Sequence, residues 1–476
     1  MDVRLEVGYC DKKIGRIVKD GCTKAWDRVQ LRTYNGELQG PVIKARAGDT
    51  LNITLDNKLP PDPNPGSDNP NIPHGFNITN LHFHGLHVSP AGNADNVNIA
   101  VGPGQRFHYE VKVPSDHPAG TYWYHPHKHG SVALQLGSGM AGALIIRGDI
   151  DEVPAIEDAE EKLLIFQQFA YAVGPDGIGR LESYQHIPFP AWLSLGRRIC
   201  INGELEPTFR LCPGEVQRWR LINADFSEGV NLKLVKRDPR TRAEVPLTQY
   251  QIALDGITTG FLEGVTMTEL HPGYRVDLLV RAADNEGRPL PEGVYWLVDD
   301  DSEPERRDLA RIVVKGRRVR HALPTERELR PLAPFKPIED HELTGTQEAI
   351  YDIDFSKTPP QFRVNGRPYD PHARPRQLKV DTAERWLVSS PPSPVSAAHS
   401  FHIHVNPFQL TRPDGRVIWK DTIFMPAGVT LELRTRYKRY IGTFVHHCHV
   451  VDHGDLGMME SLEIIPPRMA HEHPPH

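Results

Sequence analysis

Residues 446–458, near the end of the chain, bring together several side chains that bind metal ions. They read His-His-Cys-His-Val-Val-Asp-His-Gly-Asp-Leu-Gly-Met. A thiolate, two imidazoles and a weakly bound axial thioether are the ligands of a blue-copper electron-transfer site. Cys448, His453 and Met458 supply all but one of these ligands, so a second histidine must come from elsewhere in the chain.

The order of residues 447–449 allows one strand to serve two metal centres. Neighbouring side chains of an extended strand point to opposite faces. Cys448 would therefore face one way, while His447 and His449 would face the other. The backbone of Cys448 would then form a short path between a mononuclear centre and a cluster.

A cluster of this kind requires three further histidine pairs, and earlier parts of the chain supply them. In each His-x-His the two rings leave a strand on the same face, so both can reach one cluster. His399 lies an odd number of positions before both His402 and His404. On a continuous strand its ring therefore points to the face opposite theirs, as Cys448 does relative to His447 and His449. We therefore predict His399 as the second histidine of the blue site. The pairs are His82 and His84, His125 and His127, and His402 and His404.

With these motifs in this order, the chain resembles three-domain multicopper oxidases of the laccase and bilirubin-oxidase type over nearly its whole length. The resemblance implies four copper ions: one type 1, one type 2 and a type 3 pair. Its type 1 ligands would be His399, Cys448, His453 and Met458. Its type 2 ligands would be His82 and His402. Its type 3 ligands would be His84, His125, His127, His404, His447 and His449. All twelve positions are filled, which argues against a copper-free relative.

Reduction of O2 to water consumes protons, so acidic side chains are expected near the cluster. Asp95, just after the first histidine pair, and Asp452 are the first candidates for this catalytic role, although each also fits a turn-capping role. Many relatives carry a carboxylate directly after the second type 1 histidine, where this chain has Gly454. Asp455 or Asp452 is therefore expected to replace that carboxylate.

Length and composition agree with three all-β units. A chain of 476 residues suffices for about three domains of roughly 150 residues each. The 43 prolines and 39 glycines suit many short strands joined by turns. We predict units at residues 1–148, 160–316 and 346–468. The alternation of polar and apolar residues indicates only the all-β class. The family resemblance further implies that each unit is a cupredoxin-like Greek-key β-sandwich. The middle unit has no metal motif and is expected to be a spacer and a wall of the substrate cleft.

Composition also limits partners and compartment. The net charge of −6 comes without a basic stripe, so nucleic-acid binding has no support. No window has the apolar length of a membrane-spanning helix. The first residues carry no secretory signal, but the family is usually exported. We therefore expect a periplasmic or secreted protein whose signal is absent from this chain, with a cytoplasmic location as the alternative. The oligomeric state stays open.

Four cysteines remain after Cys448 is assigned to copper: Cys10, Cys22, Cys200 and Cys212. Two disulfides are arithmetically possible, and the sequence does not decide between them. We expect most of these cysteines to be free, buried and apolar in behaviour.

Three functions are compatible with the ligand set. The first is a laccase-like oxidase that couples one-electron oxidation of small phenols or aromatic amines to four-electron reduction of O2. The second is a metallo-oxidase of Cu(I) or Fe(II), which often has a methionine-rich segment; the 7 methionines here form no such segment. The third is a non-catalytic copper-binding protein, which the complete ligand set disfavours.

Overall fold

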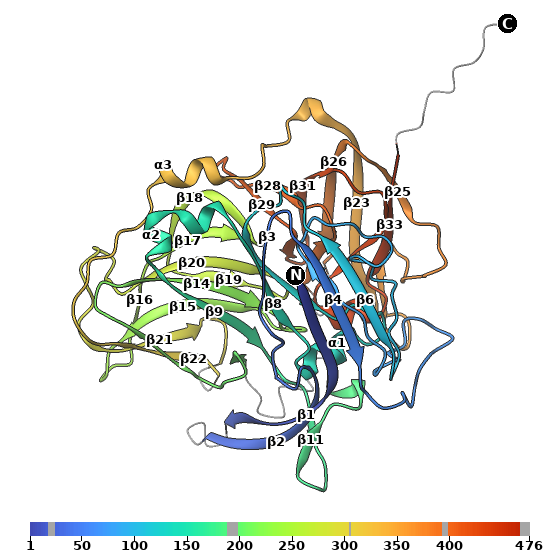
Figure 1. Ribbon diagram of the computed structural model, residues 1–476, viewed down its shortest axis with the longest axis horizontal. Coiled ribbons are helices and arrows are strands. Elements are labelled where there is room, and N and C mark those ends of the chain that lie inside the picture. Colours follow the sequence, from blue (N-terminus) through green and yellow to red (C-terminus); the bar gives the residue numbers. More distant parts are fainter. Residues whose placement is uncertain (18–23, 188–198, 304–305, 393–397, 467–476) are drawn as a thin grey trace, which may run out of the picture.

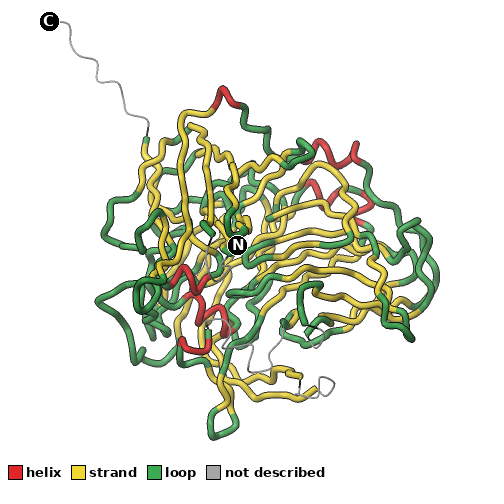
Figure 2. Tube along the Cα trace, turned by 180° about the vertical axis from the view of Figure 1, so that it is seen from behind, coloured by secondary structure: helices red, strands yellow, loops and turns green. Residues whose placement is uncertain are grey.

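The computed structural model describes residues 1–17, 24–187, 199–303, 306–392 and 398–466. Strands form six sheets, and each successive part of the chain contributes two of them (Figure 1). Seen from the opposite side, strands again dominate and helical segments are few and short (Figure 2). The prediction of an all-β, cupredoxin-like fold is confirmed.

The first two sheets contain the strands of residues 2–147 and one later hairpin. The larger sheet runs in the order β10 (Ala172–Val173), β11 (Ile178–Arg180), β2 (Lys24–Tyr34), β1 (Asp2–Ile17), β4 (Thr50–Asn57) and β6 (Arg106–Lys112). The smaller sheet runs in the order β3 (Ile43–Arg46), β8 (Gly142–Arg147), β7 (Gly120–His125) and β5 (His82–His84).

The two middle sheets contain no residue of a histidine pair. One runs in the order β12 (Cys200–Ile201), β9 (Glu160–Gln167), β14 (Val216–Asn223), β20 (Arg275–Arg281), β17 (Gln249–Leu254) and β18 (Ile257–Val265). The other runs in the order β13 (Thr208–Leu211), β22 (Asp308–Val314), β21 (Gly293–Asp299), β15 (Val230–Arg237) and β16 (Glu244–Pro246), and pairs through β15 with β19 (Thr268–Leu270).

The last two sheets contain the remaining histidine pairs and Cys448. One runs in the order β24 (Gln361–Val364), β23 (Leu343–Asp354), β26 (Thr382–Ser390), β31 (Val429–Tyr437), β28 (Phe408–Thr411) and β29 (Val417–Lys420). The other runs in the order β25 (Arg376–Lys379), β33 (Met459–Ile465), β32 (Gly442–Cys448), β27 (His399–Ile403) and β30 (Thr422–Met425).

Short helical segments connect the sheets. The α-helices are α1 (Val132–Ser138), α2 (Pro154–Glu157), α3 (Glu326–Leu329) and α4 (Val451–Asp455). The 3-10 segments are η1 (Asp149–Glu152), η2 (Tyr184–His186), η4 (Arg330–Leu332) and η5 (Asp340–Glu342). In the described part of the chain, none of these helices combines the length and apolar character required to cross a lipid bilayer.

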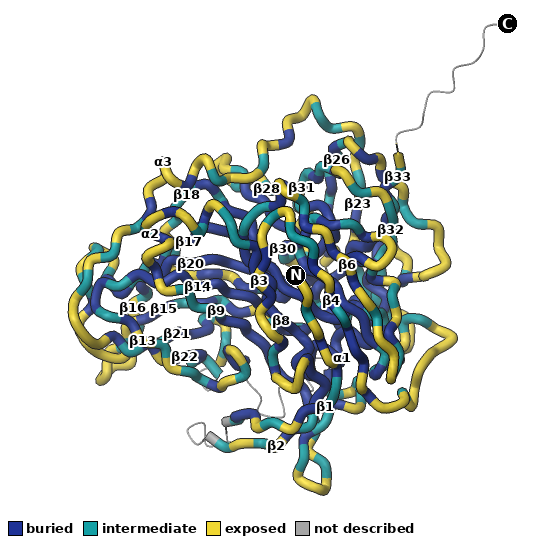
Figure 3. The backbone as a smooth tube through the Cα atoms, in the orientation of Figure 1, coloured by how far each residue is buried: buried dark blue, intermediate teal, exposed yellow. Residues whose placement is uncertain are grey.

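Each pair of sheets encloses its own hydrophobic core. In the first core, Leu55 of the larger sheet and Phe83 of the smaller sheet belong to one buried cluster. Trp219 lies in the second core and Trp386 in the third, and both are almost fully buried. The strands β14 and β20 are dark blue in Figure 3 because nearly every residue in them is buried. Both faces of these two strands are therefore covered by protein.

The hairpin β10–β11 lies in the range predicted for the second unit but completes a sheet of the first. Strand β11 pairs in parallel with β2, with Ile178 opposite Arg28. The next residues fasten this contact, because the buried guanidinium of Arg32 donates to the Leu181 carbonyl (2.6 Å) and to the Glu182 carboxylate (2.7 Å). The chain therefore starts the middle unit with β9, returns to the first unit with β10 and β11, and then continues the middle unit from β12.

The structure places three of the four cysteines other than Cys448. In the described residues no disulfide joins them; Cys10 and Cys200 are buried, and Cys212 is half-buried. Cys22 lies outside the described residues.

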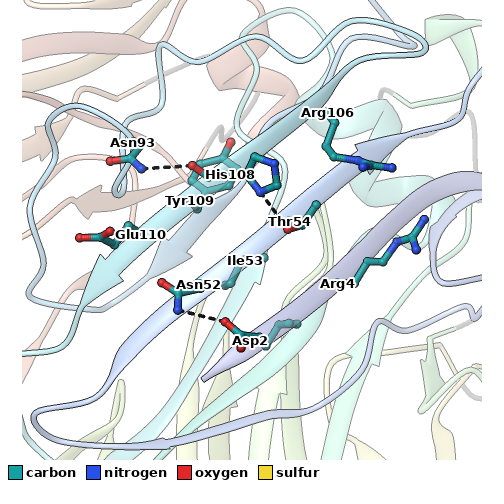
Figure 4. Close-up of a pocket in the computed structure, with 11 residues that line it drawn as sticks. Asp2, Arg4, Asn52, Ile53, Thr54, Asn93, Arg106, His108, Tyr109 and Glu110 are labelled. Carbon is teal, nitrogen blue, oxygen red and sulfur yellow. Dashed lines mark hydrogen bonds between the residues drawn. The ribbon is translucent and has the colours of Figure 1, made fainter.

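A groove of about 580 Å³ lies along β1, β4 and β6, on the larger sheet of the first unit (Figure 4). Its polar side chains bond to one another: the Asn52 amide donates to Asp2 (3.0 Å), and the Thr54 hydroxyl lies 3.0 Å from His108 Nδ1. No predicted site residue lines this groove. The chemistry predicted from the sequence therefore belongs elsewhere.

The contact between the first and middle units leaves no space at Gly120. A Cβ built on Gly120, in β7, would lie 1.8 Å from the carbonyl oxygen of Gly256, in the turn between β17 and β18. We expect Gly120→Ala to lower the free energy of unfolding by about 2 kcal/mol or more, because overpacking typically costs 1–3 kcal/mol. Thermal unfolding measures this change. Gly66→Ala is the control, since no atom lies within 4 Å of its Cβ, and equal midpoints for both variants would contradict the expectation.

Candidate metal centres

Strands β27 and β32 bring Cys448 to His399 and His453. The strands are antiparallel neighbours, with Phe401 opposite Cys448 and His402 opposite His447. The Cys448 Sγ lies 3.7 Å from His399 Nδ1 and 3.7 Å from His453 Nδ1. The two Nδ1 atoms lie 3.1 Å apart. One thiol and two imidazoles thus converge on one point, as a mononuclear site requires.

The segment after Cys448 folds back so that Met458 joins the same buried region. Helix α4 carries His453, and the Met458 amide donates to the His453 carbonyl (2.9 Å). The Cys448 amide in turn donates to the Met458 carbonyl (3.0 Å). Met458 is fully buried in the same hydrophobic cluster as Cys448. These backbone bonds hold the thioether-bearing residue beside the thiol.

The histidine pairs meet where the first and third units touch. The first pair lies on β5, and the other pairs lie at or just past the ends of β7, β27 and β32. Their nitrogens form three buried groups whose atoms lie within 4.8 Å of one another. The groups are His82 with His84 and His402, His84 with His125 and His449, and His127 with His404 and His447.

Close nitrogen–nitrogen distances join the two units across this seam. His127 Nε2 lies 3.0 Å from His447 Nε2, and His84 Nδ1 lies 3.1 Å from His449 Nε2. Because His447 and His449 flank Cys448, the strand end that bears the thiol also contributes to two of the histidine groups. All eight residues of the predicted pairs are therefore assembled in one place.

The ring nitrogens of this assembly fit metal ions. His82 Nε2, His125 Nε2 and His402 Nε2 are buried and have no hydrogen-bond partner. The opposite nitrogen of each ring donates to the protein: to Asp95 (2.9 Å), to the Pro126 carbonyl (2.9 Å) and to the Asp421 carbonyl (2.8 Å). Such outer bonds fix the tautomer that leaves the inner nitrogen as a metal ligand. An unpartnered buried nitrogen is costly unless an ion binds it.

Burial keeps the imidazoles neutral. It lowers the pKa of His127 to about 3 and holds the pKa values of His82, His84 and His125 well below their usual range. Neighbouring imidazoles lower several of these values further. Burial also raises the pKa of the Cys448 thiol to about 12, so this thiol keeps its proton until a metal ion displaces it. The neutral rings present lone pairs to an ion.

The three predicted acids lie in different surroundings. Asp95 groups with His82 and His404, and burial raises its pKa to about 8. Burial raises the pKa of Asp452 to about 7, and one of its carboxylate oxygens has no partner. Asp455 instead accepts hydrogen bonds from three backbone amides at the start of α1, those of Gly130, Val132 and Ala133.

Sequence reasoning missed Asp421 and Arg275. The Asp421 carboxylate accepts from His84 Nε2 (3.0 Å) and from the fully buried Arg275. Arg275 lies in a strand without a metal-binding pattern, and Asp421 stands in no motif. Neither residue gave a local signal, because the partners that define their roles lie far away in the chain.

Comparisons with known proteins agree with this geometry. Residues 73–150 and 342–468 match multicopper oxidase family models. The chain is 24% identical to multicopper oxidase mco of Staphylococcus aureus over 449 residues, which cover 90% of this chain and 83% of that protein. It is 26% identical to a laccase of Bacillus stratosphericus, in an alignment that covers 93% of this chain and 91% of that laccase. The structure of a multicopper oxidase from Campylobacter jejuni, titled a metallo-oxidase, aligns with a TM-score of 0.72 at 24% identity, covering 98% of this chain and 91% of that one.

The matched segments carry the histidine pairs and Cys448, and the relatives extend over nearly the whole chain. The chain is therefore a multicopper oxidase. Within that family it is of the three-domain, laccase-like type, an oxidoreductase with O2 as acceptor and copper as cofactor, which confirms the class predicted from the sequence.

The contacts of Asp455 predict a structural effect of its removal. Its carboxylate satisfies three amides that have no partner within helix α1, and loss of such a cap costs about 1–2 kcal/mol. We therefore expect Asp455→Ala to lower the unfolding free energy of the copper-free protein by that amount, measured by denaturant unfolding. Asp414→Ala, on an exposed turn, is the control. A variant as stable as the unaltered protein would contradict the capping role.

Proposed function

We propose that this enzyme oxidises small phenols or aromatic amines one electron at a time and reduces O2 to two waters. The observation that carries the proposal is the position of Cys448 between a mononuclear ligand set and the histidine groups that contain His447 and His449. The export implied by the family resemblance is part of the proposal, and places the enzyme in the periplasm or outside the cell.

The proposal assigns four copper ions to the converging side chains. His399, Cys448, His453 and Met458 would hold the type 1 ion, and His82 and His402 the type 2 ion. The type 3 pair would be held by His84, His125 and His449 on one side and by His127, His404 and His447 on the other. When bound, these ions supply one-electron oxidation at the first site and four-electron reduction of O2 at the cluster.

Electrons enter through the most accessible side chain of the mononuclear site. His453 is half-buried, whereas His399, Cys448 and Met458 are buried. The ring of Phe362 packs against His453, with 4.9 Å between centroids. An aromatic donor that stacks at this edge needs no deep pocket, because a ring that loses one electron forms a delocalised radical. His453 thus joins the outside donor to the buried thiol.

The internal path from the thiol to the cluster is short and rigid. Cys448 is bonded directly to His447 and His449, and the His447 Nδ1 donates to the Cys448 carbonyl (2.9 Å). The His449 amide donates to the Ser400 carbonyl (2.7 Å), which ties this segment to β27. These bonds hold both rings in place, so electrons need cross only one residue of backbone.

The methionines favour an organic substrate over a metal ion. Among the described residues, Met1 and Met267 are the exposed methionines, while Met425, Met458 and Met459 of the third unit are buried. A Cu(I) oxidase needs soft sulfur ligands that an incoming ion can reach. The buried thioethers near Cys448 do not offer such a surface.

O2 uptake by the copper-loaded protein tests the function. We expect a blue absorption band, type 1 and type 2 signals in the electron paramagnetic resonance (EPR) spectrum, and O2 consumption with a methoxyphenol that is faster than with Cu(I). Faster uptake with Cu(I) would favour the metallo-oxidase. Copper-loaded protein without uptake from either donor would leave a copper-binding protein.

Asp95 is the acid that we propose to deliver protons to the cluster. Its carboxylate accepts from His82 Nδ1 and from the Phe83 amide (3.0 Å), at the edge of the histidine assembly. Asp95→Asn keeps the shape but not the acid, so we expect turnover to fall by about 100-fold, the lower range for a lost proton donor. O2 uptake measures turnover, with copper content determined in parallel. Full activity at normal copper content would remove Asp95 from the mechanism and leave Asp452 and Asp455 as candidates.

A further inference from the structure

The middle unit contributes no histidine pair, yet one of its strands reaches both copper-bearing units. On β20, Arg275 and Asp277 lie two positions apart and face the seam between the units. Asp277 accepts from the Thr121 hydroxyl of the first unit (2.6 Å). Arg275 is fully buried, and its guanidinium forks onto both oxygens of Asp421 in the third unit. Strand β20 thus holds the units that carry the cluster ligands.

Every N–H group of the Arg275 guanidinium donates a hydrogen bond, so the side chain is fixed in one orientation. Besides Asp421, the guanidinium donates to the carbonyls of Gly273 (3.0 Å), Asp255 (2.7 Å) and Thr121 (3.3 Å). A planar guanidinium that grips a carboxylate with two parallel bonds fixes its orientation as well as its charge. Asp421 is therefore held in one position.

Asp421 in turn orients two histidines from different units, His84 and His402. Its carboxylate accepts from His84 Nε2 (3.0 Å), and its backbone carbonyl accepts from His402 Nδ1 (2.8 Å). The two rings stack with 3.9 Å between centroids and 13° between planes. One residue thus orients a ring from the first unit and a ring from the third.

The bond to Asp421 also selects the nitrogen that His84 presents. Because Nε2 donates to the carboxylate, Nδ1 is the free atom, and it lies 3.1 Å from His449 Nε2. His82, His125 and His402 show the opposite choice, with Nδ1 bonded outward and Nε2 unpartnered. Loss of the Asp421 carboxylate would leave His84 Nε2 with the longer contact to Thr422 Oγ1 (3.3 Å), which specifies the tautomer less firmly.

We propose that the Arg275–Asp421 pair is a positioning device by which the middle unit orients His84 and His402 for copper binding. This inference rests on the proposed function, and it gives the middle unit a role beyond that of spacer and cleft wall. A second buried pair supports the same loop: Asp255 accepts from Lys420 Nζ (3.1 Å) and from the amides of Asp421 and Thr422 (3.2 Å each).

The test compares copper binding at the cluster with copper binding at Cys448. Asp421→Asn turns one acceptor of the fork with Arg275 into a donor and weakens the bond to His84 Nε2. We therefore expect copper affinity at the cluster to fall by about 10- to 100-fold, as is usual when a group bonded to a ligand histidine is replaced. The blue absorption, which reports on the thiolate, should stay at its normal intensity per protein. The two affinities are measured separately during titration with a copper chelator. The type 2 EPR signal reports copper binding at the cluster, and the blue absorption band reports copper binding at Cys448.

Two arginine variants supply the controls. Arg275→Lys keeps the charge but cannot form the fork, so we expect a smaller loss in the same direction. Arg218→Gln removes an equally buried arginine that pairs with Asp277 (2.7 Å) and touches no histidine. We expect this variant to be less stable in thermal unfolding but to keep the affinity of the cluster.

Three outcomes would overturn the inference. The first is normal affinity of the cluster in Asp421→Asn. The second is an equal loss in Arg218→Gln, which would make the effect one of general stability. The third is a parallel loss of the blue band and the type 2 signal in Asp421→Asn. Failure of the proposed function is distinguishable, because it would already appear as missing blue and type 2 signals in the unaltered protein.

Discussion

The alternation of side chains at the end of β32 is the constraint on which the whole molecule depends. Cys448 points into the core of the third unit, while His447 and His449 point out of it toward the first unit. One strand can satisfy both directions only if a second unit meets it at that end. Two features of the fold meet this requirement. Strand β27 pairs with β32 within the third unit, and strands β5 and β7 of the first unit lie across the seam from them.

Burial gives the site its chemical character. The imidazoles of the seam are neutral because water is excluded, and several inner nitrogens have no protein partner. Folding without an ion therefore carries the cost of unpartnered polar atoms, which binding of an ion offsets. The outward nitrogens are bonded to Asp95, Asp421 or backbone carbonyls, so the rings cannot rotate to relieve that cost. Metal affinity and the stability of the seam are consequently linked.

Local patterns in the sequence carry the histidine pairs, Cys448 and the all-β class, because strand alternation and ligand spacing act over a few residues. What the sequence did not reveal depends on partners that are distant in the chain. Asp421 gains its role from Arg275 and His84, and Asp455 from amides of helix α1. The hairpin β10–β11 likewise reads as part of the second unit until its pairing with β2 is seen.

That hairpin has a consequence for synthesis of the protein. A chain leaves the ribosome from its N-terminus, so β2 emerges long before β11 exists to cover its edge. Until residues 172–180 follow, the first unit presents an open strand that can pair with a neighbouring nascent chain. A segment from the start of the second unit thus covers the open edge of the first. The first unit can complete its larger sheet only after the ribosome has translated this segment.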